Sequence, residues 1–351
     1  MEGEALSEIG TESVNLLRIG DPSNFGKNDW WSLSDWHKIT ASGFSCDVVC
    51  DAGTAGELAI AGVSIRGHKH RVDGSPNEDS FAVRIANGGD GCEYAVLVVC
   101  DGLSSAKHSA YAARRTSTLV ADMLSRVIAN ADFTIERFKL VISTCLKEFV
   151  VPELISWPNP SGELSLPAFG CPDIRSSEVS TSELLVTLTI AIVPTKNGPK
   201  GASDILLATI GDSPALILTQ KGEWVRPEYS VGDDGVLTTT TAAFPKNSDI
   251  AVSEVVLYEG DCLCLMSDGV GNFVKNRNEP LRLGKHLAQV WKTPRDIPTL
   301  IRDVSFDLRS ADDDRTVILC WTDREIPDSS STLQSLNSTQ DASQTAEAVS
   351  E

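Results

Sequence analysis

The sequence predicts an α+β domain in which antiparallel strands and helices form separate layers. Short apolar segments bounded by Gly, Asp, Asn and Ser predict strands joined by tight turns. The helical patterns come in two separate pairs instead of one between each two strands, which argues against a parallel βαβ sheet. Hydrophobic residues make up 41% of the 351 residues, enough to bury a substantial core.

The first predicted strands cover residues 57–67, 80–86 and 94–100, and the last of these is so uniformly apolar that it must be buried. Gly211–Ser213 and Lys221–Glu223 read as turns of an antiparallel meander, and Glu259–Asp261 reads as another turn. Further strands are predicted at residues 183–193, 204–211, 214–220, 252–258, 262–267 and 316–321.

Apolar stripes at helical spacing predict the helices. One helix is expected from 109 to 129, and a second from about 134 to an end at Pro152. The other pair is expected near 281–292 and 297–309, directly before the last strand.

These elements define three parts of the chain. Residues 1–57 are expected to form a partly ordered N-terminal arm, and 58–322 the folded domain. Residues 323–351 form an acidic Ser/Thr-rich stretch without periodic apolar residues, which predicts a disordered tail. Three tryptophans in the arm, Trp30, Trp31 and Trp36, favour anchoring of the arm on the domain over a partner-binding patch.

Charge and hydropathy exclude several classes of protein. With 30 basic and 49 acidic residues the net charge is −19, which disfavours binding to nucleic acid or to an anionic membrane surface. The longest apolar runs are about half of the roughly 20 residues that a spanning helix needs. The N-terminus is acidic and has no apolar leader, and the nine cysteines are scattered. We therefore expect a cytoplasmic location.

The chemistry lies in acidic residues at the ends of predicted strands. Asp101-Gly102 and Asp268-Gly269 each follow an apolar strand, Asp312–Asp314 precedes the last one, and Asn77–Asp79 opens another. Each site alone is explained by an ordinary turn, but four together are not. Clustered carboxylates repel one another unless cations neutralise them, and Mg²⁺ or Mn²⁺ prefers oxygen ligands. The pattern predicts a divalent-metal site.

Five ordered motifs carry a resemblance to a known family. In sequence they read HRVDGSPNEDS (70–80), VVCDG (98–102), IGDS (210–213), MSDG (266–269) and DDRTV (313–317). In this order, across residues 58–322, they resemble the type 2C metal-dependent protein phosphatases, and the bacterial branch in particular. The resemblance implies a four-layer sandwich of two antiparallel β-sheets flanked by α-helix pairs.

The resemblance also implies roles for single residues. Asp101 would bridge two Mg²⁺ or Mn²⁺ ions, and a hydroxide between them would attack phosphorus. The Gly102 carbonyl would help bind one ion. The full metal set implied by the resemblance is Glu78, Asp79, Asp101, Gly102, Asp268 and Asp313.

Basic residues near these motifs are the candidates for phosphate contact. His70 is either a general acid or phosphate contact, or a histidine that holds the loop. The family places an arginine four residues before the position of Glu78, where this chain has Gly74, so the phosphate-binding arginine is either replaced by Arg71 or absent. Gly211–Ser213 is interpreted as a structural turn in preference to a direct metal ligand. Family members often have an acidic ligand for a third metal just before the strand that begins near Leu184; here Val179 occupies the equivalent position, with Glu178 and Glu183 as candidate substitutes.

The leading hypothesis is therefore a Mg²⁺/Mn²⁺-dependent phosphatase acting on phosphoserine and phosphothreonine in proteins, opposing a Ser/Thr kinase. The main alternative is a phosphatase-like regulatory binding module with weak or no turnover. A glycosidase-type hydrolase that uses two carboxylates without metal is a third, less favoured hypothesis.

Overall fold

The structure is a computed structural model that describes residues 46–129, 138, 142–156, 180–198, 201–229, 242–276 and 279–322. The three arm tryptophans, the tail from 323 and residues 157–179, which include Val179, lie outside the described residues. Within the described part of the chain, no helix is both long and apolar enough to cross a membrane.

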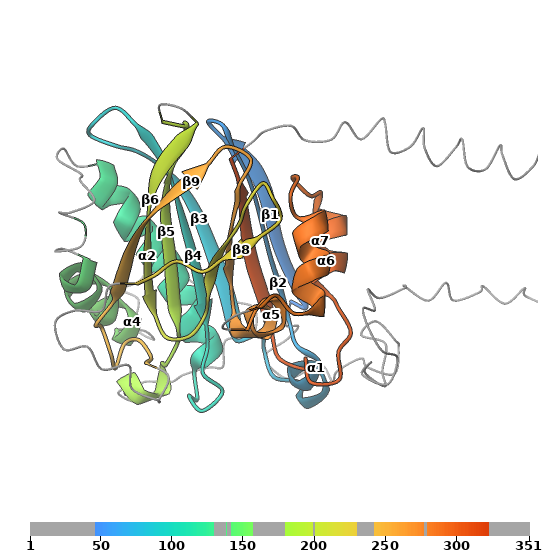
Figure 1. The fold of residues 1–351 in the computed structure, drawn as a ribbon. Helices are drawn as coiled ribbons and strands as arrows, with labels where there is room; N and C mark the ends of the chain where they lie inside the picture. Colours follow the sequence, from blue (N-terminus) through green and yellow to red (C-terminus); the bar gives the residue numbers. More distant parts are fainter. Residues whose placement is uncertain are drawn as a thin grey trace, which may run out of the picture.

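Two antiparallel sheets form the centre of the fold (Figure 1). The six-stranded sheet has the order β1 (Val48–Ala55), β2 (Leu58–Ile65), β11 (Arg315–Trp321), β10 (Cys262–Met266), β7 (Ala215–Leu218) and β8 (Trp224–Val225). The five-stranded sheet has the order β3 (Asp79–Asn87), β4 (Glu93–Asp101), β5 (Leu188–Pro194), β6 (Ala202–Ile210) and β9 (Ala251–Tyr258).

The sheets pack face to face over one apolar layer, and helices cover both outer faces. Side chains such as Leu97, Leu207 and Leu265 fill the space between the sheets. The five-stranded sheet is covered by α2 (Ser109–Ala129), the π-helical turn η3 (Leu146–Val150) and α4 (Val151–Ile155). The six-stranded sheet is covered by α5 (Asp268–Val274), α6 (Arg282–Val290) and α7 (Ile297–Val304). This confirms the four-layer α+β sandwich (Figure 1).

The structure places β1 within the segment that the sequence pattern assigned to the N-terminal arm. All eight residues of β1 pair with β2. The hydrophobic pattern does not predict this strand, because β1 is an edge strand whose residues are mostly exposed. Its sequence VVCDAGTA therefore lacks the alternation of a half-buried strand.

The predicted meander is wrong in one respect. β6 and β7 are consecutive in sequence but belong to different sheets, as do β9 and β10. The turns at Gly211–Ser213 and Glu259–Asp261 therefore pass the chain from one sheet to the other. Turn residues mark where a strand ends, but they do not specify which sheet the next strand joins.

Three helical segments depart from the sequence prediction. The predicted second helix continues past Pro152 to Ile155, because Pro152 lies in the first turn of α4, where a proline nitrogen is tolerated. Two short helices, α1 (His68–Asp73) and α5, occupy segments that the sequence predicts as loop and turn. Gly74 ends α1 in the left-handed conformation, with φ of 72°.

Candidate active site

Strand pairing brings the first two predicted ligands together. Asp79 begins β3, Asp101 ends β4, and the two are Cα partners in the antiparallel register. Directly opposite residues of an antiparallel pair point to the same face. The next residue, Gly102, lies so close to the preceding strand that a Cβ there would be 2.7 Å from the Glu78 carbonyl oxygen. The amide N–H of Gly102 donates to that oxygen over 3.0 Å.

The other sheet contributes the remaining predicted carboxylates. Asp268 is the first residue of α5, two residues after the end of β10, and its backbone nitrogen lies 3.5 Å from Asp101 Oδ2. Asp313 stands two residues before β11, which pairs with β10. The ends of β3, β4, β10 and β11 therefore meet at one edge of the sandwich. The charges of Asp79, Asp268 and Asp313 all act on Asp101, so these four carboxylates lie near one another.

Burial and mutual repulsion raise the pKa values of these carboxyl groups. The pKa of Asp79 is raised well above its ordinary value by burial and then by the charge of Asp314. Burial, followed by the charges of Asp79 and Asp268, has the same effect on the pKa of Asp101. The pKa of Asp268 is raised by burial and by Asp313, and that of Glu78 is raised mainly by burial. Such a cluster is stabilised by a bound cation.

The donor set fits a hard divalent cation. Asp79 Oδ2 is buried and has no hydrogen-bond partner, so an oxygen of the right type is available for coordination. Among the described residues, a group whose ligand atoms lie within 4.8 Å of one another is His70, Asp313 and Asp314. This group shares only Asp313 with the set implied by the resemblance.

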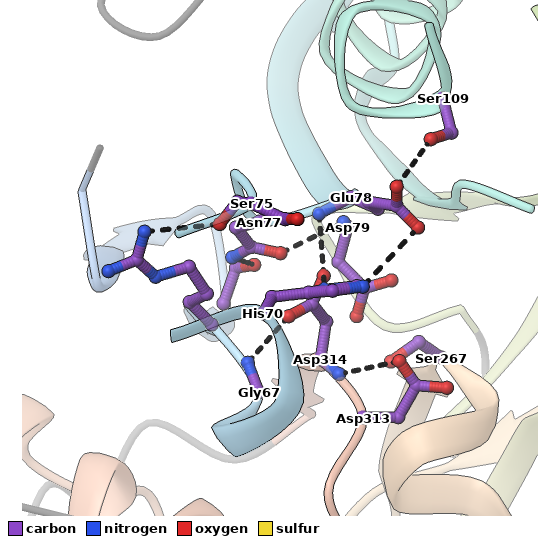
Figure 2. A network of polar contacts seen from close by, with 12 residues as sticks. Gly67, His70, Ser75, Asn77, Glu78, Asp79, Ser109, Ser267, Asp313 and Asp314 are labelled. Atoms are coloured by element: carbon purple, nitrogen blue, oxygen red, sulfur yellow. Dashed lines mark hydrogen bonds and ion pairs between the residues drawn. The ribbon is translucent and has the colours of Figure 1, made fainter. Parts of the chain in front are cut away.

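Asp314 is a residue that the sequence reasoning did not single out, although it follows Asp313 directly. Its side chain accepts hydrogen bonds from the backbone N–H groups of Gly67 and Glu78, each over 2.5 Å, and contacts His70 Nδ1 at 2.9 Å (Figure 2). Ser109 was also missed; its Oγ donates to Glu78 Oε1 over 2.7 Å. The sequence pattern placed Asp314 in an acidic motif without indicating its role, and it contained no signal for Ser109.

His70 lies in α1 and is only 4% exposed. Its ring stands between two carboxylates, with Nδ1 bonded to Asp314 and Nε2 3.7 Å from Glu78 Oε2 (Figure 2). Burial by itself lowers the pKa of His70, but the hydrogen bond and charge of Asp314, with the charges of Glu78 and Asp313, outweigh it, so the pKa is raised. Both readings of His70 from the sequence, proton donor and holder of the local structure, are compatible with this position.

Arg71 is directed to a different partner. Its Nε lies 3.5 Å from Asp47 Oδ2, and its side chain is only 5% exposed. Asp47 also pairs with the fully buried Arg66, whose Nη1 donates to the Ser75 carbonyl over 3.2 Å. This ion-pair cluster fastens α1 and the turn after it to the start of β1.

The turn at Gly211–Ser213 stabilises the local backbone and also places a negative charge near the acidic cluster. Gly211 has φ of 102°, a conformation that favours glycine, and Ser213 Oγ lies 2.6 Å from Thr187 Oγ1. The charge of Asp212 contributes to the raised pKa of Asp268, so Asp212 faces the acidic cluster. Glu183, a substitute for the missing third-metal ligand, instead accepts from the backbone N–H of Ser180 over 3.1 Å.

Comparison with known proteins agrees with the motifs. The family model described as protein phosphatase 2C matches residues 66–300, more than half of the chain. No curated protein matches the sequence.

Several solved bacterial structures are similar in fold. One is a serine/threonine phosphatase from S. agalactiae (16% identity, TM-score 0.47, covering 75% of this chain and 99% of that one). Another is RsbX in complex with magnesium (12%, TM-score 0.44, 78% and 98%). A third is the phosphatase domain of SpoIIE from Bacillus subtilis (15%, TM-score 0.38, 82% and 97%).

Proposed function

The chain belongs to the protein phosphatase 2C family, and we propose that it is a metal-dependent phosphatase that removes phosphate from phosphoserine and phosphothreonine in proteins. The observation that carries this proposal is the meeting of Asp79 and Asp101 from one sheet with Asp268 from the other, as carboxylates whose pKa values are raised by burial and by one another. We further propose that the phosphoprotein substrate is produced by a Ser/Thr kinase, and that the protein acts in the cytoplasm.

Two Mg²⁺ or Mn²⁺ ions are proposed for this cluster, held by Glu78, Asp79, Asp101, the carbonyl of Gly102, Asp268 and Asp313. When bound, such ions activate water for attack on phosphorus and neutralise the charge of the phosphate. The protein contributes the positions of the ligands. Rigid strand ends fix Asp79 and Asp101, and Ser109 orients the carboxylate of Glu78 through its hydroxyl.

His70 is proposed to donate a proton to the leaving serine or threonine oxygen. Its bond to Asp314 engages Nδ1 and leaves Nε2 as the nitrogen that can transfer a proton. The raised pKa keeps the imidazole protonated closer to neutral pH. For Arg71, the ion pair with Asp47 favours a role in holding α1 over direct contact with phosphate.

A second candidate function is a regulatory module that binds phosphoprotein or metal without turnover. Arg71, the candidate replacement for the family's arginine, is buried and paired with Asp47, and this observation favours the module. Weak binding of the phosphate would then limit catalysis, while the acidic cluster would still take up metal.

The decisive experiment is hydrolysis of a phosphoserine peptide and of p-nitrophenyl phosphate with Mn²⁺. Asp101→Asn and Asp268→Asn should each abolish activity, whereas Asp204→Asn, at an exposed position of β6, should leave it unchanged. Binding of Mn²⁺ by calorimetry without turnover would favour the regulatory module. Hydrolysis that persists in EDTA would contradict the proposed metal dependence, and equal activity in all variants would refute the proposal.

A further inference from the structure

Asp314 occupies a central position beneath the acidic cluster. It is only 3% exposed and directly precedes β11. Its three hydrogen-bond donors come from different parts of the fold: Gly67 precedes α1, His70 lies within α1, and Glu78 precedes β3 (Figure 2). One buried side chain therefore ties together three elements at the edge of the site.

The geometry leaves little room for Asp314 to act as a metal ligand itself. Oδ1 accepts from the N–H of Gly67, and Oδ2 accepts from the N–H of Glu78 and faces His70 Nδ1. A carboxylate has about four lone-pair sites, so three of them already have partners inside the protein. Asp313, in contrast, is exposed, and its Oδ1 accepts only a local bond from the N–H of Asp314 over 2.9 Å.

The contacts of Asp314 help to fix the position of Glu78. The backbone of Glu78 is held by Asp314 through its N–H and by Gly102 through its carbonyl oxygen, and its side chain is held by Ser109. A residue restrained at three points presents its carboxylate in one orientation. Groups that orient metal ligands in this way typically change metal affinity by about 10- to 100-fold when they are removed.

We propose that Asp314 is a positioning residue that sets the orientation of Glu78 and His70 for metal binding, and that it does not bind the ions. This inference rests on the proposed function, because it assumes that Glu78 takes part in a metal site. It assigns different roles to two neighbouring aspartates, Asp313 as ligand and Asp314 as support.

The test compares metal binding by calorimetry with Mn²⁺, using the full chain. Asp314→Asn removes the charge but keeps the shape. Whichever way its amide turns, the NH₂ group faces either the N–H of Gly67 or the donors at Glu78 and His70, so the triple contact cannot form. We expect this variant to bind the same number of ions as the wild type, with about 10- to 100-fold weaker affinity.

Matched variants separate positioning from a merely structural role. Asp204→Asn makes the same chemical change at an exposed position of β6 outside the acidic cluster, and it should bind Mn²⁺ as the wild type does. His70→Ala removes one donor to Asp314 and should weaken Mn²⁺ binding. His70→Asn should restore much of that loss, since its Nδ2 takes the place of the histidine Nδ1.

Three results would overturn the inference. Loss of one bound ion in Asp314→Asn would identify Asp314 as a ligand. Wild-type affinity in folded Asp314→Asn would show that the contacts serve stability alone. If Asp314→Asn does not fold, equal Mn²⁺ affinity in His70→Ala and the wild type decides against positioning. Absence of Mn²⁺ binding by the wild type is a separate result, which would remove the proposed function together with this inference.

Discussion

Asp79 and Asp101 lie directly opposite each other on β3 and β4, as Cα partners at the end of the paired strands. The register of the hairpin forces both carboxylates onto the same face of the sheet. Burial raises the pKa of each, and the charge of Asp79 raises the pKa of Asp101 further. A pairing of this kind destabilises the protein when both groups are ionised and no cation is present.

The first prediction concerns the pH dependence of stability without metal. The carboxyl groups of Glu78, Asp79, Asp101 and Asp268 have pKa values above those in the unfolded chain. Their contribution to stability is therefore fully present below the ordinary carboxyl pKa of about 4, and it is lost as the pH rises through the raised values.

In EDTA, we therefore expect the Tm to fall between pH 5.5 and pH 8, as measured by differential scanning calorimetry. Saturating Mn²⁺ should raise the Tm more at pH 8 than at pH 5.5, because ionised carboxylates bind the cation. An identical effect of Mn²⁺ at both pH values would contradict this prediction.

A second prediction separates stability from activity at Asp101. Asp101→Asn removes one charge from the cluster and should raise the Tm in EDTA at pH 8 by about 2–4 °C for each kcal/mol of repulsion relieved. The same variant should lose phosphatase activity. Asp204→Asn, on the exposed surface of β6, should change neither quantity. A lower Tm for Asp101→Asn in EDTA would show that repulsion is not the dominant effect at this position.

A third prediction concerns Arg315, which is fully buried at the start of β11. Its guanidinium donates to the carbonyl oxygens of Val304, Phe306 (2.6 Å) and Ala311, and stacks 4.1 Å from the centre of the Phe306 ring. Arg315→Lys cannot reproduce this planar set of contacts. We expect it to lower the free energy of unfolding by about 3 kcal/mol, since several buried carbonyl oxygens lose their donors.

Urea unfolding followed by circular dichroism measures this loss. Arg302→Lys is the matched control, because the side chain of Arg302 is 57% exposed and should contribute less than about 0.5 kcal/mol. Equal free energies of unfolding for the two variants would show that the contacts of Arg315 are not important for stability.

A fourth prediction tests the boundary of the folded domain. A chain that starts at residue 46 keeps β1 and Asp47 and should fold. A chain that starts at residue 58, the boundary expected from the sequence, exposes the edge of β2 and removes the ion-pair partner of Arg66 and Arg71. We expect the shorter chain to unfold or aggregate, because the loss of an ion-pair partner by buried arginines and a free sheet edge are both costly.

Size-exclusion chromatography and circular dichroism distinguish the two chains. Asp47→Ala in the full chain isolates the ion-pair contribution, and we expect it to cost about 2 kcal/mol, since Asp47 is itself partly exposed. A stable, monomeric chain starting at residue 58 would contradict the prediction.

Much of the fold was predictable because it depends on local pattern. Buried strands such as β4 are recognisable as continuous apolar runs, and α2 as an apolar stripe at helical spacing. β1 was not predictable in this way, since an exposed edge strand has no buried face to leave a pattern. Whether β7 joins the sheet of β6 or the opposite one also depends on packing between distant segments.

In the candidate site, too, some features follow from local sequence and others from tertiary structure. The sequence by itself determined which carboxylates stand at strand ends, because Asp101, Asp268 and Asp313 each adjoin an apolar run that must be buried. Only the tertiary structure decided the partners of these groups: Asp79 opposite Asp101, Arg71 with Asp47 instead of the metal cluster, and Asp314 beneath His70 and Glu78. The physical reason is that apolar periodicity is local in sequence, whereas side-chain hydrogen bonds join residues as many as 252 positions apart.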